Sequence, residues 1–159
     1  MATRVVCSNP QQARRAALRA ARAYTGRALV VALPSPELPR LRESLAGEAD
    51  VEFCEGGGLA KLCRTLGEAD DRIAAIVVEP APGGGPIYKR FLKKARELAS
   101  AEGAVLIWDE TLTDTAAFPG GLQVFYKIKP DLSCLPASDA ERPVRLDGKT
   151  EILEHEAAL

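Results

Sequence analysis

The sequence predicts an α/β fold, a mostly parallel sheet with helices on both faces. The clearest signal is a set of short, continuously apolar runs at residues 28–33, Ile73–Val78 and 104–108, which are typical of strands buried on both faces. Segments with helical spacing of apolar residues alternate with these runs, and that alternation favours parallel strands joined by helices. The chain has 159 residues, of which 47% are apolar and 27% charged, as in an ordinary single globular domain.

The first predicted helix begins at Pro10 and continues to about Tyr24. Ser8 and Asn9 precede it as side-chain caps, proline suits its first position, and Gly26 provides the stop. Small residues recur along it at helical spacing, so we expect a narrow face that packs closely on the sheet. Arginines fill the remaining turns and are expected on the solvated face: Arg14, Arg15, Arg19 and Arg22.

The later elements continue the alternation. We expect a weaker helix over residues 36–46, a strand over 51–54 and a short helix over 59–66. A longer amphipathic helix is expected from about Pro86 to Gly103, where glycine ends it.

We expect a single α/β domain over residues 1–135 and a C-terminal tail over residues 136–159. The sequence becomes turn-like after Pro136, and only residues 151–159 have the pattern of a short terminal helix. Terminal segments are commonly poorly ordered unless something ties them down, so this tail is expected to be mobile or docked on a partner.

Composition and charge exclude several classes of function. The net charge of −1 gives no field that would attract nucleic acid or an anionic membrane. No apolar run is long enough for a spanning helix and no signal-peptide pattern is present, so a cytoplasmic protein is expected. The four cysteines are scattered without a CxxC pair, and His155 is the only histidine, so no metal site is expected.

Acidic residues follow two of the predicted strands. Glu79 comes directly after Ile73–Val78, and Asp109 and Glu110 come directly after 104–108. Ligands of open parallel sheets bind outside the carboxyl ends of the strands, because loops and helix N-termini converge there. We therefore take Asp109 and Glu110 as candidate catalytic residues, with Glu79 as their neighbour.

Five segments carry a family resemblance, and they follow one another along the chain. They are Arg-Ala-Ala-Arg-Ala-Tyr-Thr-Gly-Arg (19–27), Ile-Val-Val-Glu-Pro (76–80), Phe-Leu-Lys-Lys-Ala-Arg-Glu-Leu (91–98), Gly-Ala-Val-Leu-Ile-Trp-Asp-Glu (103–110) and Lys-Pro-Asp-Leu-Ser-Cys-Leu (129–135). Together they resemble the large domain of class III pyridoxal-phosphate (PLP) aminotransferases of the glutamate-1-semialdehyde aminomutase type. The resemblance implies a truncated core of the fold-type I PLP-dependent transferase large domain.

The resemblance transfers the chemistry of the family at one position only. Asp109 matches the carboxylate that keeps the pyridine nitrogen of PLP protonated. Ala137 stands where the family has the lysine that forms the aldimine, so no aldimine can form there. Asn9-Pro10-Gln11 aligns with the Ser-Gly-Thr phosphate cradle, and proline lacks the N–H that an anion needs. The resemblance thus implies a degenerate scaffold.

Our first hypothesis is a catalytically silent pseudoenzyme that binds a partner or a small ligand, with no cofactor expected. The resemblance to dimeric enzymes, with part of their fold missing, implies a homodimer or a larger partner subunit.

Two other hypotheses remain open, so the sequence does not decide whether the protein is an enzyme. One is a cofactor-independent biosynthetic enzyme that uses Asp109 and Glu110 as acid and base. The other retains PLP through Lys127, Lys129 or a lysine of another subunit, with Asp109 as the cofactor-binding carboxylate.

Overall fold

The computed structural model describes residues 2–34, 40–54, 58–137 and 144–157. Its strands are β1 (Ala2–Cys7), β2 (Leu29–Leu33), β3 (Val51–Phe53), β4 (Ile73–Val78), β5 (Val105–Asp109), β6 (Leu132–Pro136) and β7 (Val144–Lys149). Its helices are α1 (Pro10–Thr25), α2 (Arg40–Ser44), α3 (Gly58–Ala69), α4 (Gly85–Glu102), α5 (Leu122–Tyr126) and α6 (Thr150–Ala157), with a 3₁₀ turn η1 (Asp70–Arg72).

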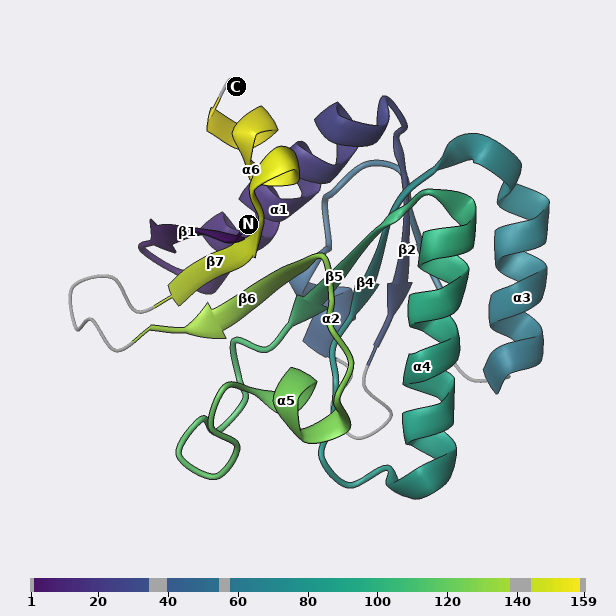
Figure 1. The fold of residues 1–159 in the computed structure, drawn as a ribbon. Coiled ribbons are helices and arrows are strands. Elements are labelled where there is room, and N and C mark those ends of the chain that lie inside the picture. Colours follow the sequence, from purple (N-terminus) through teal and green to yellow (C-terminus); the bar gives the residue numbers. More distant parts are fainter. Residues whose placement is uncertain (1, 35–39, 55–57, 138–143, 158–159) are drawn as a thin grey trace.

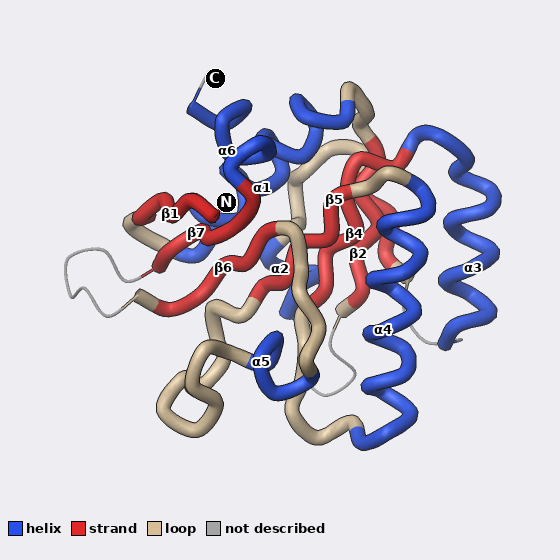
Figure 2. The backbone as a smooth tube through the Cα atoms, viewed as in Figure 1, coloured by secondary structure: helices blue, strands red, loops and turns tan. Residues whose placement is uncertain are grey.

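The strands of the described residues form one seven-stranded sheet in the order β1-β7-β6-β5-β4-β2-β3 (Figure 2). The pairs β2·β3, β2·β4, β4·β5 and β5·β6 are parallel, whereas β7 pairs antiparallel with both β6 and β1. Helices α1 and α6 cover one face, and α3 and α4 cover the other (Figure 1). The predicted fold class, a mostly parallel sheet with helices on both faces, is confirmed.

Helix α1 lies close to the sheet because its inner face carries almost only alanine. Ala13, Ala17, Ala20 and Ala21 are fully buried in the core on that face. The Asn9 side chain accepts the Gln12 N–H at 2.8 Å, which satisfies one of the free donors at the helix start. Gly26 ends the helix with a φ of 67°, a left-handed conformation that glycine adopts without a steric penalty.

The segment that we expected to be a tail contributes two elements to the fold. Strand β7 lies between β1 and β6, and α6 packs against α1, with Ile152 and Leu153 buried. The alternation of buried Val144 and Leu146 with less buried residues is the pattern of a strand that is covered on one face. Residues 138–143 and 158–159 of the expected tail lie outside the described residues.

The predicted central elements occur close to their expected positions. Strands β2, β4 and β5 are buried along their whole length, as expected for continuously apolar runs. The weaker helix is described only as α2, because residues 35–39 lie outside the described ranges. None of the helices in the described ranges is long and apolar enough to span a bilayer.

Asp131 connects three strands at the amino edge of the parallel strands. Its Oδ2 accepts the Leu106 N–H at 2.8 Å and Arg96 Nη2 at 3.0 Å, and its Oδ1 pairs with Lys149 Nζ at 2.7 Å. Burial alone would raise the pKa of this carboxyl, but the Leu106 N–H and the two cations outweigh burial and hold the pKa below its ordinary value. Asp131 therefore stabilises the junction of β5, β6 and β7.

Candidate functional site

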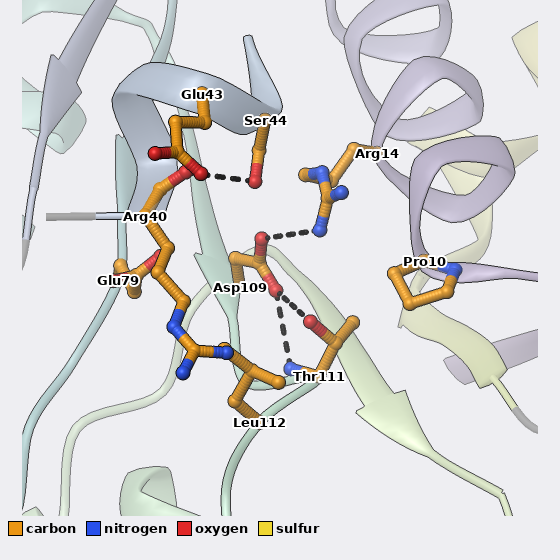
Figure 3. Close-up of a pocket in the computed structure, with 9 residues that line it drawn as sticks. All are labelled: Pro10, Arg14, Arg40, Glu43, Ser44, Glu79, Asp109, Thr111 and Leu112. Atoms are coloured by element: carbon orange, nitrogen blue, oxygen red, sulfur yellow. Dashed lines mark hydrogen bonds and ion pairs between the residues drawn. The ribbon is translucent and has the colours of Figure 1, made fainter. Parts of the chain in front are cut away.

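A pocket of about 210 Å³ lies at the carboxyl ends of β4 and β5, beside α1 and α2 (Figure 3). Its position is the one that the strand-end argument predicted, since loops and helix starts meet at this edge. The pocket is lined by side chains of both charges and by a few apolar groups: Pro10, Arg14, Arg40, Glu43, Ser44, Glu79, Asp109, Thr111 and Leu112.

Asp109 lines the pocket and accepts hydrogen bonds at both of its carboxylate oxygens. Its Oδ1 accepts the Thr111 N–H at 3.1 Å and the Thr111 hydroxyl at 2.8 Å. Its Oδ2 forms an ion pair with Arg14 Nη1 at 3.0 Å, which Figure 3 shows reaching across from α1. The Asp109 side chain is 4% exposed and that of Arg14 is 14% exposed, so the pair is shielded from solvent and neutralises itself.

Arg14 is the functional residue that sequence reasoning missed. We expected all arginines of the first helix on its solvated face, and for Arg15, which is 57% exposed, that expectation is met. For Arg14 it is wrong, because this side chain follows the helix row that contains buried Leu18 and Ala21. That four-residue spacing was the available signal, and it indicates a side chain directed at the sheet edge.

Glu79 is a buried carboxyl with incomplete hydrogen bonding. It is 7% exposed, and its Oε1 has no hydrogen-bond partner among the described residues. Burial and the nearby Asp109 charge raise the pKa of Glu79 to about 7, against the weaker opposite effects of Arg14 and Arg40. Near neutral pH this group can therefore hold a proton or release it, as an acid or base requires.

Glu110 lies apart from the pocket, although it follows Asp109 directly. Its carboxylate accepts hydrogen bonds from the Leu122 N–H, the Thr113 hydroxyl at 3.2 Å and the Gln123 amide at 3.2 Å. Burial raises its pKa, and these donors oppose the rise. A Cβ on Gly121 would lie 2.6 Å from its Oε2, so glycine is needed there. Glu110 holds the start of α5 in place, and the structure does not bring it together with Asp109 as an acid and base pair.

A second cavity of about 290 Å³ adjoins the first one. Glu79, Asp109 and Leu112 line both cavities. The other lining residues are mostly apolar and come from the loop after β4, the loop after β5 and α5: Pro80, Ala81, Pro82, Thr113, Asp114, Phe118 and Leu122. The site therefore has a charged half and an apolar half that meet at Asp109.

The residues of the charged half do not fit PLP in the manner that the family resemblance implies. Asp109, which would meet the pyridine nitrogen, already holds the Arg14 guanidinium. At the start of α1 the Ser8 N–H binds the Gln12 side chain, the Gln12 N–H binds Asn9, and Pro10 has no N–H to offer a phosphate. Ala137 follows β6, and none of the described residues lining either cavity is a lysine.

No family model matches the chain. A search of curated proteins finds glutamate-1-semialdehyde 2,1-aminomutases, including that of Desulforudis audaxviator strain MP104C, which is 36% identical over 150 residues. This match covers 78% of the chain and 34% of the relative. The chain thus spans about a third of the length of the curated relatives that it matches.

Solved transaminase structures share the fold. An omega-transaminase from Sphaerobacter thermophilus superimposes with a TM-score of 0.76 at 23% identity, over 95% of this chain and 41% of the other. A glutamate-1-semialdehyde aminomutase from Pseudomonas aeruginosa PAO1, described as a lysine-to-alanine variant in complex with PMP, gives a TM-score of 0.71 at 24% identity, over 98% and 39% of the two chains.

These comparisons correct our expectation that no cofactor is involved. One solved structure that shares the fold is a transaminase with PLP bound, and the Pseudomonas variant is in complex with PMP although a lysine has been replaced by alanine. An alanine at position 137 therefore does not by itself argue against a cofactor, because the aminated form can be held without a covalent bond. By sequence and by fold, over about a third of the length of such an enzyme, the chain is a relative of the class III PLP-dependent aminotransferases.

Proposed function

We propose that this chain is a small-ligand-binding relative of the class III aminotransferases, without transaminase activity of its own. Its ligand site is the pocket at the carboxyl ends of β4 and β5. The observation that carries the proposal is the buried ion pair between Arg14 and Asp109, at 3.0 Å. The carboxylate that the family uses toward a ring nitrogen has a resident cation here, and the pocket beside it is still open.

The side chains that the pocket offers support the proposed absence of transaminase activity. Amino-group transfer through an aldimine needs a primary amine near the reacting carbon. The described lining residues supply guanidinium, carboxyl and hydroxyl groups, which bind and orient a ligand but form no aldimine. Recognition of a polar small molecule is the chemistry that this set supports.

A second candidate function is cofactor-independent acid and base catalysis, which Glu79 favours. Its pKa of about 7 and its position in the same cavity as Asp109 suit proton transfer near neutral pH. Glu110, our original partner for Asp109, is committed to α5 through Leu122 and Gln123. Glu79→Gln should therefore abolish any such activity.

We also propose that the protein associates with a second copy or with a larger partner subunit. Leu112, Val124 and Phe125 are 58%, 60% and 52% exposed, and Phe125 packs edge-on against Phe118 beside the apolar cavity. Exposed apolar side chains grouped in this way are typical of an interaction surface. Sedimentation equilibrium tests this proposal, and a monomer that persists at high concentration contradicts it.

The experiment that tests the proposed function is a ligand titration of the full chain. PLP, PMP and small acids and amines are added to ¹⁵N-labelled protein, and amide shifts are mapped in NMR spectra. Shifts at Glu79, Asp109 and Thr111 are the expected result. If none of the compounds shifts these amide signals, the proposed ligand site is wrong. A borohydride-reducible aldimine band together with turnover of an amino donor would overturn the absence of transaminase activity.

A further inference from the structure

We infer that the ligand is a small amphipathic carboxylic acid, whose carboxyl group binds among Arg14, Arg40 and Glu79 and whose apolar body lies against Leu112 and Phe118. This inference rests on the proposed function and specifies the chemistry of its ligand. It follows from the two cavities described above and from the polar groups around them.

The two cavities form a single site of the usual size for a small ligand. They have about 210 and 290 Å³, and both are lined by Glu79, Asp109 and Leu112. Ligand sites commonly measure roughly 300–1,000 Å³ and are mostly apolar with a few polar groups that fix orientation. The second cavity is close to the lower end of this range, and both together lie within it. A ligand that fills the site must therefore be polar at one end and apolar at the other.

The available hydrogen-bond donors of the polar half favour an acid over an amine. Asp109, the carboxylate to which an ammonium would bind, is occupied by Arg14 and by both Thr111 donors. The Nε of Arg14 is buried and has no hydrogen-bond partner among the described residues. The exposed Arg40 lines the same pocket from α2 (Figure 3). Guanidinium groups bind carboxylates through paired, charge-assisted hydrogen bonds.

Glu79 completes the acid site as the group that holds a proton. A buried carboxyl oxygen without a partner is unfavourable, and a proton shared with a ligand carboxylate removes that penalty. The charged groups around Glu79 are Asp109 from β5, Arg14 from α1, and Arg40 and the exposed Glu43 from α2, with Asp114 lining the second cavity. Binding of the ligand anion should therefore take up a proton and weaken as the pH rises through about 7.

The apolar half supplies the second requirement. Phe118 lies between the cavity and Phe125, with ring centroids of the two phenylalanines 5.2 Å apart. Leu112 is 58% exposed at the point where both cavities meet. A hydrophobic body bound here would cover Leu112, which gives the ligand a driving force that a short polar acid lacks.

The test compares three probes: 3-phenylpropionate, acetate and 2-phenylethylamine. Isothermal titration calorimetry at pH 6 should show 3-phenylpropionate binding about tenfold or more tightly than either of the others. Leu112→Ala should weaken 3-phenylpropionate about three- to tenfold and leave acetate unchanged. Ile87→Ala, which removes an exposed apolar side chain outside both cavities, is the matched control and should change neither affinity.

The Glu79→Gln variant tests whether the proton on Glu79 contributes to ligand binding. The wild-type affinity for 3-phenylpropionate should fall between pH 6 and pH 8, whereas the affinity of the variant should be independent of pH in that range. Preference for 2-phenylethylamine, or equal binding of acetate, would overturn the acid proposal while the pocket remains a ligand site. If no probe, PLP or PMP moves the Asp109 and Thr111 amides, the proposed function fails as well.

Discussion

Asp131 and Glu79 are both buried carboxyl groups at strand ends, but they lie on opposite edges of the parallel strands and differ in their donors. Asp131, at the amino edge, receives the Leu106 N–H and two cations, and its pKa is held low. Glu79, at the carboxyl edge, keeps one oxygen without a partner among the described residues, and burial raises its pKa to about 7. The first group is satisfied by the fold, whereas the second depends on something that the fold does not supply.

This difference separates stability from function within one sheet. A carboxylate with a complete set of donors makes its junction more stable when charged, so selection for folding alone accounts for it. A buried carboxyl with an orphan oxygen destabilises the folded state, and such groups cluster at sites that bind or react. The comparison supports a structural role for Asp131 and the proposed ligand-binding role for Glu79.

The largest expected effect is at Asp131. Asp131→Asn removes the charge that Arg96 and Lys149 share, and should lower the free energy of unfolding by about 2–4 kcal/mol at pH 7. Because the folded-state pKa is depressed, the wild-type advantage is present above the unfolded value and is lost as the pH falls through the folded one. Urea unfolding at pH 7 and in acid measures both effects, and a loss below about 1 kcal/mol at pH 7 contradicts the assignment.

A smaller effect is expected for the pair of Arg14 and Asp109. Asp109→Asn should cost about 2 kcal/mol, because it leaves the shielded guanidinium without a counter-charge. In the double variant with Arg14→Leu, much of this cost should disappear, giving a coupling of about 1–2 kcal/mol. Chemical denaturation of the four proteins supplies the cycle. If the effects of the two single changes simply add, Arg14 does not pair with Asp109 in solution.

Glu79→Gln is expected to act in the opposite direction. The folded-state pKa of about 7 lies above the unfolded value of 4.5, so the stability of the wild type falls as the pH rises between these values. The variant should therefore be more stable than the wild type at pH 8, by about 1–2 kcal/mol, and equal to it near pH 4. Thermal melts across this range test the sign. If the variant is less stable than the wild type at pH 8, the charged Glu79 stabilises the fold as Asp131 does.

The smallest effect on stability is expected at Lys149, one of the two cations that bind Asp131. Lys149 is 47% exposed, so its ion pair with Asp131 is largely solvated, and Lys149→Met should cost less than about 1 kcal/mol. Arg96 is 23% exposed and also donates to the Lys129 carbonyl, so Arg96→Met should cost more. Unfolding at low and high salt distinguishes the two, and an equal, salt-independent cost would contradict this ranking.

The sheet could be predicted wherever its strands are apolar without interruption. Strands β4 and β5 are buried on both faces, and short runs of five or six apolar residues are typical of such strands. Strand β7 escaped prediction because it is covered on one face, contains Gly148 and carries Asp147 and Lys149, so its alternation is weak.

The site could be predicted only where position along the chain determines position in space. A residue directly after a parallel strand must lie at the carboxyl edge, which located Asp109 and Glu79. The same rule predicted that Glu110 belongs to the site. Adjacent residues of an extended chain point to opposite sides, however, and the Glu110 side chain points to α5. Arg14 and Arg40 come from helices whose angle to the sheet is a tertiary property, so spacing indicates at most that Arg14 faces the sheet, and not that both arginines line the pocket of Asp109.

The antiparallel strand β1 has a consequence for how the chain folds during synthesis. Within the described residues its only strand partner is β7, and their register joins Ala2 to Lys149 and Cys7 to Val144. During synthesis β1 must therefore wait for this partner until residues 144–149 have emerged from the ribosome. Pairing across so many residues closes a very long loop, and such contacts form slowly. The addition of this edge is thus expected late in folding, and until then the unpaired edge of β1 is exposed to aggregation.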